Sequence, residues 1–421
     1  MTGRKQIHLA AHFPGVNSTT IWADPASGSQ IDFASFEHFA ATAERGRFDF
    51  LFLAEGLRLR EHKGEIHDLD VVGRPDTLTV LAAVAAVTRR LGLVGTINTT
   101  FNEPFELARQ LASLELVSGG RSGWNVVTSN DAFTGENFRR GGFLDNADRY
   151  TRAAEFVDVA EALWRGGGTD HHGEFFDVVG SLEVPASPQG RPVIVQAGVS
   201  DEGRDLAARY ADAIFSPFAE LGSGREFYAD IQRRLARFGR GADELKILPG
   251  ATFVLGDTEA DAEERYRYER RAQVSGATAV RTLEAVWGRD LSGYDPDGPL
   301  PSLDLVVDDV ELTAGRAGLH KDRRGTAREW AEKAEAGGLS IREAAISKLA
   351  RGVLVGTAAQ VADRIDEFVQ TDASDGFVLI PSITPGGLDE FVDRVIPLLQ
   401  ERGSYRGDYS GETLRENLFA G

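Results

Sequence analysis

Short apolar runs rich in β-branched and aromatic residues alternate along the chain with longer amphipathic stretches. The short runs predict eight strands, at residues 7–13, 48–54, 91–100, 123–129, 193–197, 213–216, 247–255 and 377–381. The longer stretches predict helices near residues 33–46, 77–90, 104–117, 147–165, 201–211, 224–238, 258–274 and 388–401. Such alternation is typical of parallel βαβ units, and eight units predict an α/β fold of the (β/α)8 TIM-barrel class. An open doubly wound sheet would produce a similar pattern.

Two stretches depart from this alternation. Residues 166–189 predict a β-hairpin excursion with a glycine-rich entry and a proline-containing exit. Residues 276–350 form a long insertion before the last strand, with a Gly/Pro/Asp-rich middle and charged helical flanks. Long structured insertions tend to carry function. We therefore expect a single domain over residues 1–421, with the insertion as a candidate lid or subunit contact.

Composition narrows the classes of partner and chemistry. The net charge of −19 argues against nucleic acid, because phosphate binding needs a basic surface. The absence of cysteine excludes disulfides, thiolate nucleophiles, iron–sulfur clusters and Cys-zinc sites. No segment has the apolar core of a signal peptide or the length of a membrane span. We expect a cytoplasmic protein without a membrane partner.

Polar residues stand where the second and third predicted strands end. Barrels place their sites at the carboxyl ends of strands. Glu55 follows a buried strand and either faces a ligand, forms a salt bridge at the rim or caps the next loop. Thr96 and Asn98 end the third strand and offer hydroxyl and amide groups to a ligand. Asn102, two residues before Pro104, also fits a helix N-cap.

The fourth strand and the helix after it add three further candidates. Asn125 lies within the helix-turn-strand segment 119–131 and fits either a ligand contact or a hydrogen bond in the core. Asn146 and Tyr150 lie one helical turn apart on the same face of a predicted helix start. Tyr150 could lie beside a ligand or donate to its phosphate, or it could pack against the protein.

A phosphate site is predicted where the fifth strand leads into a helix. Gly198 permits close approach of the backbone, and Ser200 precedes the first helical N–H groups. That arrangement favours an anion, although an ordinary N-cap serine would look the same. No dinucleotide fingerprint follows a strand and no phosphate-binding loop motif occurs. A single phosphate suits FMN better than FAD or NAD.

The histidines do not predict a metal centre. His8 and His12 share one face of the first strand, but no later strand end supplies another histidine. The polar cluster at 170–177 falls within the predicted hairpin and is expected to be a solvated turn. A metal-dependent barrel hydrolase is therefore disfavoured, and no metal is expected. His12 is a candidate on the substrate side, and His320 could reach the site from the insertion.

Several segments resemble one family of enzymes. They are ERGRFDFLFLAE at 44–55, FNEPFELAR at 101–109, GGRSGWNVVTSND at 119–131, PQGRPVIVQAGVS at 188–200, VGTAAQVADR at 355–364 and LQERGSYR at 399–406. This set resembles the flavin-dependent monooxygenases typified by nitrilotriacetate monooxygenase, dibenzothiophene-sulfone monooxygenase and pristinamycin synthase, within the bacterial-luciferase-like superfamily. The resemblance covers nearly the whole chain, and the insertion is its least distinctive part.

The resemblance implies a barrel that binds FMN without a covalent link. Reduced FMN (FMNH2) would come from a separate NADH-dependent flavin reductase, by transient contact or free diffusion. It would react with O2 through a C4a-(hydro)peroxyflavin and oxygenate a small organic substrate. A homodimer or homotetramer is also implied. The positions that match the family's flavin contacts are Glu55, the stretch 96–99, Asn146, Tyr150 and Ser200.

Two positions depart from the family pattern, which usually has Asp in place of Glu55 and His in place of Asn146. Asn146 cannot carry a proton near neutral pH as a histidine can. A flavin-binding protein that has lost catalysis therefore stands as one alternative, and a related barrel that uses a deazaflavin as hydride carrier stands as another. The substrate class is open. Phe13, Trp22 and Phe133 would favour an apolar substrate if they lay near the ring.

Overall fold

The computed structural model describes residues 4–15, 19–66, 75–129, 132–138, 146–307, 312–314, 322–349 and 352–419. Eight parallel strands form a closed barrel, because β10 pairs with β11 and β1 pairs with both β2 and β14. In order around the barrel they are β1 (His8–His12), β2 (Phe50–Leu53), β5 (Gly92–Asn98), β6 (Ser122–Val127), β9 (Val193–Gln196), β10 (Ala213–Ser216), β11 (Lys246–Gly256) and β14 (Gly376–Leu379). The eight predicted strands and the barrel class are confirmed, and the open sheet is excluded.

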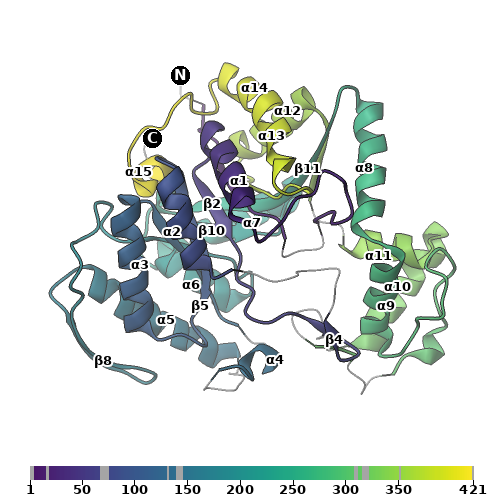
Figure 1. The fold of residues 1–421 in the computed structure, drawn as a ribbon, viewed down its shortest axis with the longest axis horizontal. Helices are drawn as coiled ribbons and strands as arrows, with labels where there is room; N and C mark the ends of the chain where they lie inside the picture. The colour runs from purple at the N-terminus through teal and green to yellow at the C-terminus, as the bar shows by residue number, and fades with distance from the viewer. Residues whose placement is uncertain are drawn as a thin grey trace.

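Helices surround the barrel and cover its outer face (Figure 1). They are α1 (Phe33–Arg45), α2 (Thr77–Val87), α3 (Pro104–Ser118), α5 (Asn146–Trp164), α6 (Asp201–Tyr210), α7 (Leu221–Arg237), α8 (Glu259–Gln273), α12 (Ala358–Gln370), α13 (Asp389–Arg394) and α14 (Ile396–Glu401). The predicted helices are confirmed to within a few residues. The last one divides at Val395, because Pro397 opens α14 and cannot donate to the preceding turn. Within the described residues, no helix is long and apolar enough to cross a membrane.

The strand β13 and the helices α12 and α15 (Leu414–Phe419), all near the carboxyl terminus, were not predicted. β13 (Val353–Thr357) pairs in parallel with the far half of β11 and leads into α12. A capping box at Thr357 and Gln360 starts α12. β13 lies outside the closed barrel, so the count of eight barrel strands is unchanged.

The barrel interior is filled from the amino end of the strands. Its apolar side chains are Ala10, Phe50, Phe52, Val94, Val193, Val195, Ala213, Leu248 and Val378. Leu414 and Leu418 of the short helix α15 (Leu414–Phe419) pack into the same cluster. A methyl group on Gly92 would meet Leu414, so the helix lies hard against the strands. α15 therefore covers the amino end of the barrel, and the polar residues singled out in the sequence lie toward the carboxyl end.

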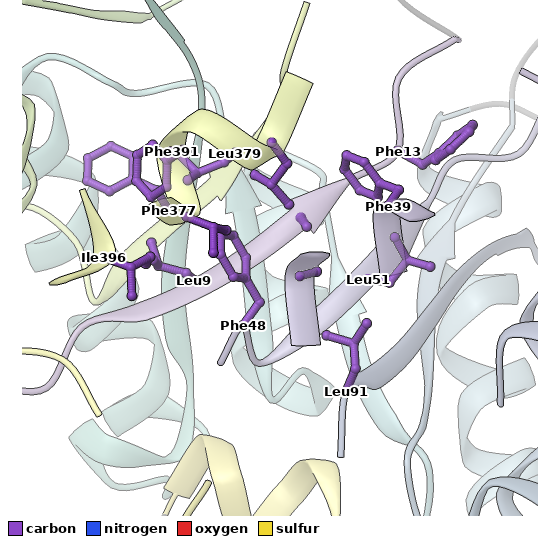
Figure 2. Close-up of a cluster of buried hydrophobic side chains, with 14 of the residues drawn as sticks. Leu9, Phe13, Phe39, Phe48, Leu51, Leu91, Phe377, Leu379, Phe391 and Ile396 are labelled. Carbon is purple, nitrogen blue, oxygen red and sulfur yellow. The ribbon is translucent and has the colours of Figure 1, made fainter. Parts of the chain in front are cut away.

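A second apolar layer lies between the barrel and the helices around it. Figure 2 shows side chains of this layer from β1, β2, β14 and the neighbouring helices. Phe13 belongs to it, with its ring stacked 4.2 Å from that of Phe36 and edge-on to Phe39 at 5.4 Å. Phe13 therefore packs against helix α1 and does not face the barrel interior, so it does not provide the substrate contact considered for it.

Both departures from the simple alternation are present as structure. The predicted hairpin consists of β7 (Thr169–His172) and β8 (Asp177–Gly180), paired antiparallel. The insertion holds α9 (Gly276–Trp287), α10 (Arg323–Gly337) and α11 (Ile341–Leu349) around an apolar cluster of its own that includes Trp287 and Trp330. These helices lie at the right of Figure 1, beside the small sheet formed by β12 (Thr313–Ala314), β3 (Glu61–His62) and β4 (Glu65–Ile66).

Candidate active site at the carboxyl end of the barrel

Asn98 is the centre of a hydrogen-bonded group at the ends of β2 and β5. Its side chain is fully buried, and its Nδ2 donates to Glu55 Oε2 at 2.8 Å. Its Oδ1 accepts the backbone N–H of Phe101 at 2.8 Å, and its carbonyl accepts Asn102 Nδ2 at 2.7 Å. These bonds fix the direction of the half-buried Glu55 carboxylate. The cap interpretation of Asn102 is wrong, because Glu103 holds the N-cap position of α3.

Thr96 and Asn125 form a second pair on the neighbouring strands β5 and β6. The two residues are partners in register, and Asn125 Nδ2 donates to Thr96 Oγ1 at 3.0 Å. Asn125 is only 2% exposed, and its Oδ1 is buried without a hydrogen-bond partner. An unsatisfied buried carbonyl costs about 1–3 kcal/mol, so such an atom points to a ligand or an ordered water. Asn125 thus makes a core hydrogen bond and keeps a free acceptor.

Ser200 and Tyr150 meet at the start of α6. Ser200 Oγ accepts the N–H of Gly203 at 3.2 Å, which confirms the N-cap prediction. The same hydroxyl donates to Tyr150 Oη at 3.3 Å. The turn before it is shaped by Gln196, whose Oε1 accepts the N–H of Gly198 at 2.7 Å. The first N–H groups of a helix favour an anion, and a phenol beside them adds a donor.

Two glycines make room around this phenol. A Cβ at Gly198 would lie 3.1 Å from Tyr150 Oη, and one at Gly203 would lie 3.0 Å from it. Both contacts are tighter than ordinary packing, so side chains here would displace Tyr150. Gly203 and Gln196 were not singled out in the sequence. The sequence does mark both residues. Gln196 is the polar residue that ends the apolar run of β9, and Gly203 is a glycine in the first turn of the next helix.

His12 is the last residue of β1 and lies at the same end of the barrel. It alternates with Ala10, so its side chain faces the interior, where it is 6% exposed. Its ring is 5.2 Å from that of Phe52, which stacks at 6.2 Å on Phe215. A Cβ at Gly250 would lie 2.5 Å from the Phe215 ring, so only glycine fits opposite it. The aromatic part of the site was not predicted.

Two predicted residues have no described side chain. Asn146 is the first residue of α5, but its side chain lies outside the described part of the structure. His320 lies entirely outside the described residues. Their expected roles stay predictions.

The polar hairpin cluster is a surface feature, as predicted. His172 Nδ1 lies 2.9 Å from Asp177 Oδ1, and the hydrogen bond to Asp177 and the charge of Asp170 raise the pKa of this exposed imidazole. His171 instead contacts Glu155 of α5 at 2.9 Å. Among the described residues, no group of three His, Asp or Glu side chains could hold a metal ion.

Comparison with known proteins identifies the family. Residues 13–375 match the luciferase-like monooxygenase family. The chain belongs to this family. Along 99% of its length the monooxygenase is 38% identical to N-acetyl-S-(2-succino)cysteine monooxygenase of Bacillus subtilis (strain 168), covering 97% of that protein. It is 35% identical to nitrilotriacetate monooxygenase component A of Aminobacter aminovorans, over 94% of this chain and 91% of that protein.

The same relationship appears among solved structures. The crystal structure of riboflavin lyase with modified FMN and substrate riboflavin superposes with a TM-score of 0.80 at 29% identity, covering 99% of this chain and 96% of that one. The predicted family, barrel class and enzyme class are thereby confirmed, and the monooxygenase is an oxygenating oxidoreductase. The relatives support the monooxygenase prediction over its deazaflavin alternative.

Proposed function

We propose that this chain is the oxygenase component of a two-component system and binds reduced FMN at the carboxyl end of its barrel. The observation that carries the proposal is the pairing of two kinds of polar group at one end of the barrel. Tyr150 and Ser200 suit a single phosphate, and Asn125 with Glu55 suits the polar edge of a ring. The similarity to nitrilotriacetate monooxygenase component A supports a two-component system, and the similarity to riboflavin lyase with modified FMN supports the cofactor.

The ring side would be held by two hydrogen-bond acceptors. Glu55, whose direction is set by Asn98, would accept an N–H of the ring. The unpartnered Oδ1 of Asn125 would accept a second donor. Thr96 would keep the Asn125 amide in place through the bond to its Nδ2. These residues orient the ring, and their own bonds leave little rearrangement to make on binding.

The phosphate side would be held by Tyr150 and the first turn of α6. Tyr150 Oη would donate to a phosphate oxygen, and the free N–H groups after Ser200 would donate to others. Asp201 opens the helix with a negative charge, but Arg234 pairs with it at 2.6 Å. The close fit of Gly198 and Gly203 around Tyr150 keeps the phenol at this end of the site.

When bound, reduced FMN supplies the chemistry, reacting with O2 so that one oxygen atom enters a small organic substrate and the other leaves as water. The protein's part is to orient the ring and to exclude water from it. His12, Asn146 and His320 are the proposed substrate-side residues, and His12 lies with the Phe52 and Phe215 rings at the barrel end.

The insertion is proposed as the lid that excludes water. It is bonded to the loop that follows β2, the loop that also carries Glu55. His62 Nε2 lies 2.5 Å from Glu284 Oε2 of α9, and Lys63 Nζ donates to the same carboxylate at 2.7 Å. Thr313 of the insertion contacts His62 Nδ1 at 2.8 Å. These bonds link lid and site loop directly.

An anaerobic titration with reduced FMN, followed by rapid mixing with oxygenated buffer, tests the proposal. We expect saturable binding, and then a flavin spectrum distinct from both reduced and oxidised FMN before reoxidation. With an NADH-dependent flavin reductase added, NADH is consumed; without it, the chain alone does not oxidise NADH. Failure to bind reduced FMN would overturn the cofactor assignment. Binding with immediate reoxidation, with and without candidate substrates, would favour a flavin-binding protein without catalysis.

A further inference from the structure

Arg152 of α5 is a buried arginine directly behind the ring side of the site. Its side chain is 2% exposed. One guanidinium nitrogen donates to the carbonyl of Thr99, and the other donates to that of Asn102 at 3.3 Å. The guanidinium lies over the ring of Phe176, 4.5 Å from its centroid. The side chain therefore bridges α5, the end of β5 and the hairpin.

We propose that Arg152 is a positioning residue for the flavin ring: it holds the loop that sets the direction of Asn98 and Glu55. The inference rests on the proposed function. Arg152 reaches the loop through the backbone carbonyls of Thr99 and Asn102. It acts through the chain of bonds that follows.

The two carbonyls belong to the loop that directly follows Asn98. Asn102, whose carbonyl receives Arg152, donates its Nδ2 to the carbonyl of Asn98 at 2.7 Å. Asn98 in turn donates to Glu55 at 2.8 Å. Thr99 is fixed from the other side, since its N–H donates to Val127 of β6 at 2.9 Å. Three hydrogen bonds in sequence therefore connect Arg152 to the proposed ring-binding carboxylate.

A guanidinium is suited to this task because its planar fork reaches two acceptors at once. A lysine ammonium is a compact charge on a flexible stem, so Arg152→Lys would hold one carbonyl at a time. The bonds of Arg152 are also kept from water, and hydrogen bonds from a charged donor are strongest where water is excluded.

The hairpin β7–β8 closes the other face of the guanidinium. Glu155 of α5 accepts the backbone N–H groups of Phe175 and Phe176, the latter at 2.9 Å, together with His171. Burial alone would raise the pKa of Glu155, but these hydrogen bonds outweigh it and lower the pKa. The charged carboxylate thus holds Phe176 against Arg152. The hairpin would thereby help to keep Arg152 in the position that holds the loop after Asn98.

The test compares flavin binding by Arg152→Met, Arg152→Lys and the unaltered protein, using FMN and riboflavin as probes. Loss of the charged donor should weaken binding of both flavins by about tenfold, the size expected for broken hydrogen bonds from a charged group. The FMN-to-riboflavin affinity ratio should stay near its original value, because the phosphate side is untouched. The visible spectrum of the bound flavin should shift, and Arg152→Lys should recover part of the loss.

Arg121 supplies a matched control at the opposite end of β5. It is 3% exposed and donates to the carbonyls of Ala85, Leu91 and Ser118, at 3.0, 2.9 and 2.7 Å. Arg121→Met removes a buried arginine that also bonds loop carbonyls, but at the amino end of the barrel. It should lower the melting temperature at least as much as Arg152→Met and leave riboflavin affinity and the flavin spectrum unchanged.

The outcomes separate the inference from the function on which it rests. If the unaltered protein binds neither flavin, the proposed function fails and the role of Arg152 fails with it. If the unaltered protein binds flavin but the Arg152 and Arg121 variants lose riboflavin affinity equally, or not at all, only the positioning role is overturned. Should either methionine variant not fold, the pair Arg152→Lys and Arg121→Lys carries the same comparison.

Discussion

Asn98 and Asn125 occupy similar buried positions on neighbouring strands, yet their hydrogen bonds differ. Both ends of the Asn98 amide are bonded within the protein, to Glu55 and to the backbone of Phe101. Asn125 uses its Nδ2 and keeps a buried Oδ1 without a partner. A buried acceptor without a hydrogen bond is costly, so we propose that Asn125 contacts the ligand, whereas Asn98 serves the protein's own structure.

Tyr150→Phe tests the phosphate side at the level of one hydroxyl. The change removes the Oη donor but spares the Ser200 cap of α6. A hydrogen bond to a charged group is worth about 1.5–3 kcal/mol, so FMN affinity should fall about tenfold or more. Riboflavin has no phosphate, and its affinity should hardly change. Both affinities are measured by fluorescence titration.

Tyr210→Phe is the control for this prediction. Tyr210 ends α6, the helix that Ser200 caps, and donates to Asp158 Oδ1 of α5 at 2.8 Å, a bond within the helix layer. Its loss should leave the FMN-to-riboflavin ratio unchanged. An equal loss of affinity for FMN and riboflavin in Tyr150→Phe would contradict a phosphate contact.

At the scale of elements, α15 is held at the amino end of the barrel by Asp212. This buried carboxylate receives Arg415 of α15 at 2.8 and 3.0 Å and Arg191 at 2.6 Å. Burial would raise the pKa of Asp212, but the two guanidinium groups outweigh it and lower the pKa. The folded state therefore favours the charged form of Asp212, and the attachment of α15 depends on that charge.

Asp212→Asn should lower stability in a pH-dependent way. A group whose folded pKa is depressed stabilises the protein fully above its unfolded pKa, and this stabilisation is lost as pH falls through the folded value. Breaking a buried ion pair costs about 3–5 kcal/mol, so near pH 7 the variant should unfold at clearly lower urea. The difference between the two proteins should shrink as pH falls below about 4.

The control for Asp212→Asn is Asp408→Asn, whose carboxylate pairs with Arg47 and is 82% exposed. An exposed pair contributes only about 0–1 kcal/mol, so little change is expected at any pH. Urea unfolding across the pH series measures both variants. A stability gap for Asp212→Asn that stays constant down to acidic pH would argue against the charge as its cause.

At the scale of the whole molecule, the insertion and the barrel meet through the loop after β2. Glu284 of α9 is 1% exposed and bonds both His62 and Lys63. The insertion is also bonded to α8, where Arg270 donates to the carbonyl of Ile346 at 2.9 Å, and it has an apolar cluster of its own. For the proposed lid, the bonds of Glu284 to the site loop are the attachment that can be tested.

His62→Ala should loosen the proposed lid. Removing one member of a buried pair costs about 3–5 kcal/mol. The loss should mainly weaken the contact between the loop that carries His62 and helix α9. Water would then reach the reduced flavin, and a larger share of the NADH consumed with a reductase should appear as hydrogen peroxide. FMN affinity should change little. Peroxide released per NADH oxidised is the measurement.

The matched control is Lys348→Ala, which removes a partly exposed pair with Glu329 inside the insertion. It leaves the attachment to the barrel intact, so peroxide release should match that of the unaltered protein. Unchanged peroxide release in His62→Ala, with the protein folded, would count against the insertion as a lid.

The order of apolar and polar residues along the chain is enough to predict most of the strands and helices and the kind of residue at each strand end. Buried apolar residues recur every two positions in a strand and about every 3.6 positions in a helix, so the local order of residues indicates which element forms. The eight barrel strands, the hairpin and the Ser200 cap were predictable for this reason. Polar groups that close apolar runs, such as Glu55, Asn98 and Asn125, were visible in the same way. β13 and α12 were missed because the insertion obscured their boundary.

Closure of the barrel and the hydrogen-bond partners of buried side chains depend on three-dimensional packing. The same alternation serves an open sheet, and the pairing of β10 with β11 and of β14 with β1 closes the barrel. Local pattern indicates that a side chain is buried but not which atom it meets. Arg152 and Thr99 are 53 residues apart, and their contact depends on how α5 packs across the barrel. Hydrogen-bond partners across such distances are set by three-dimensional packing, which no local period encodes.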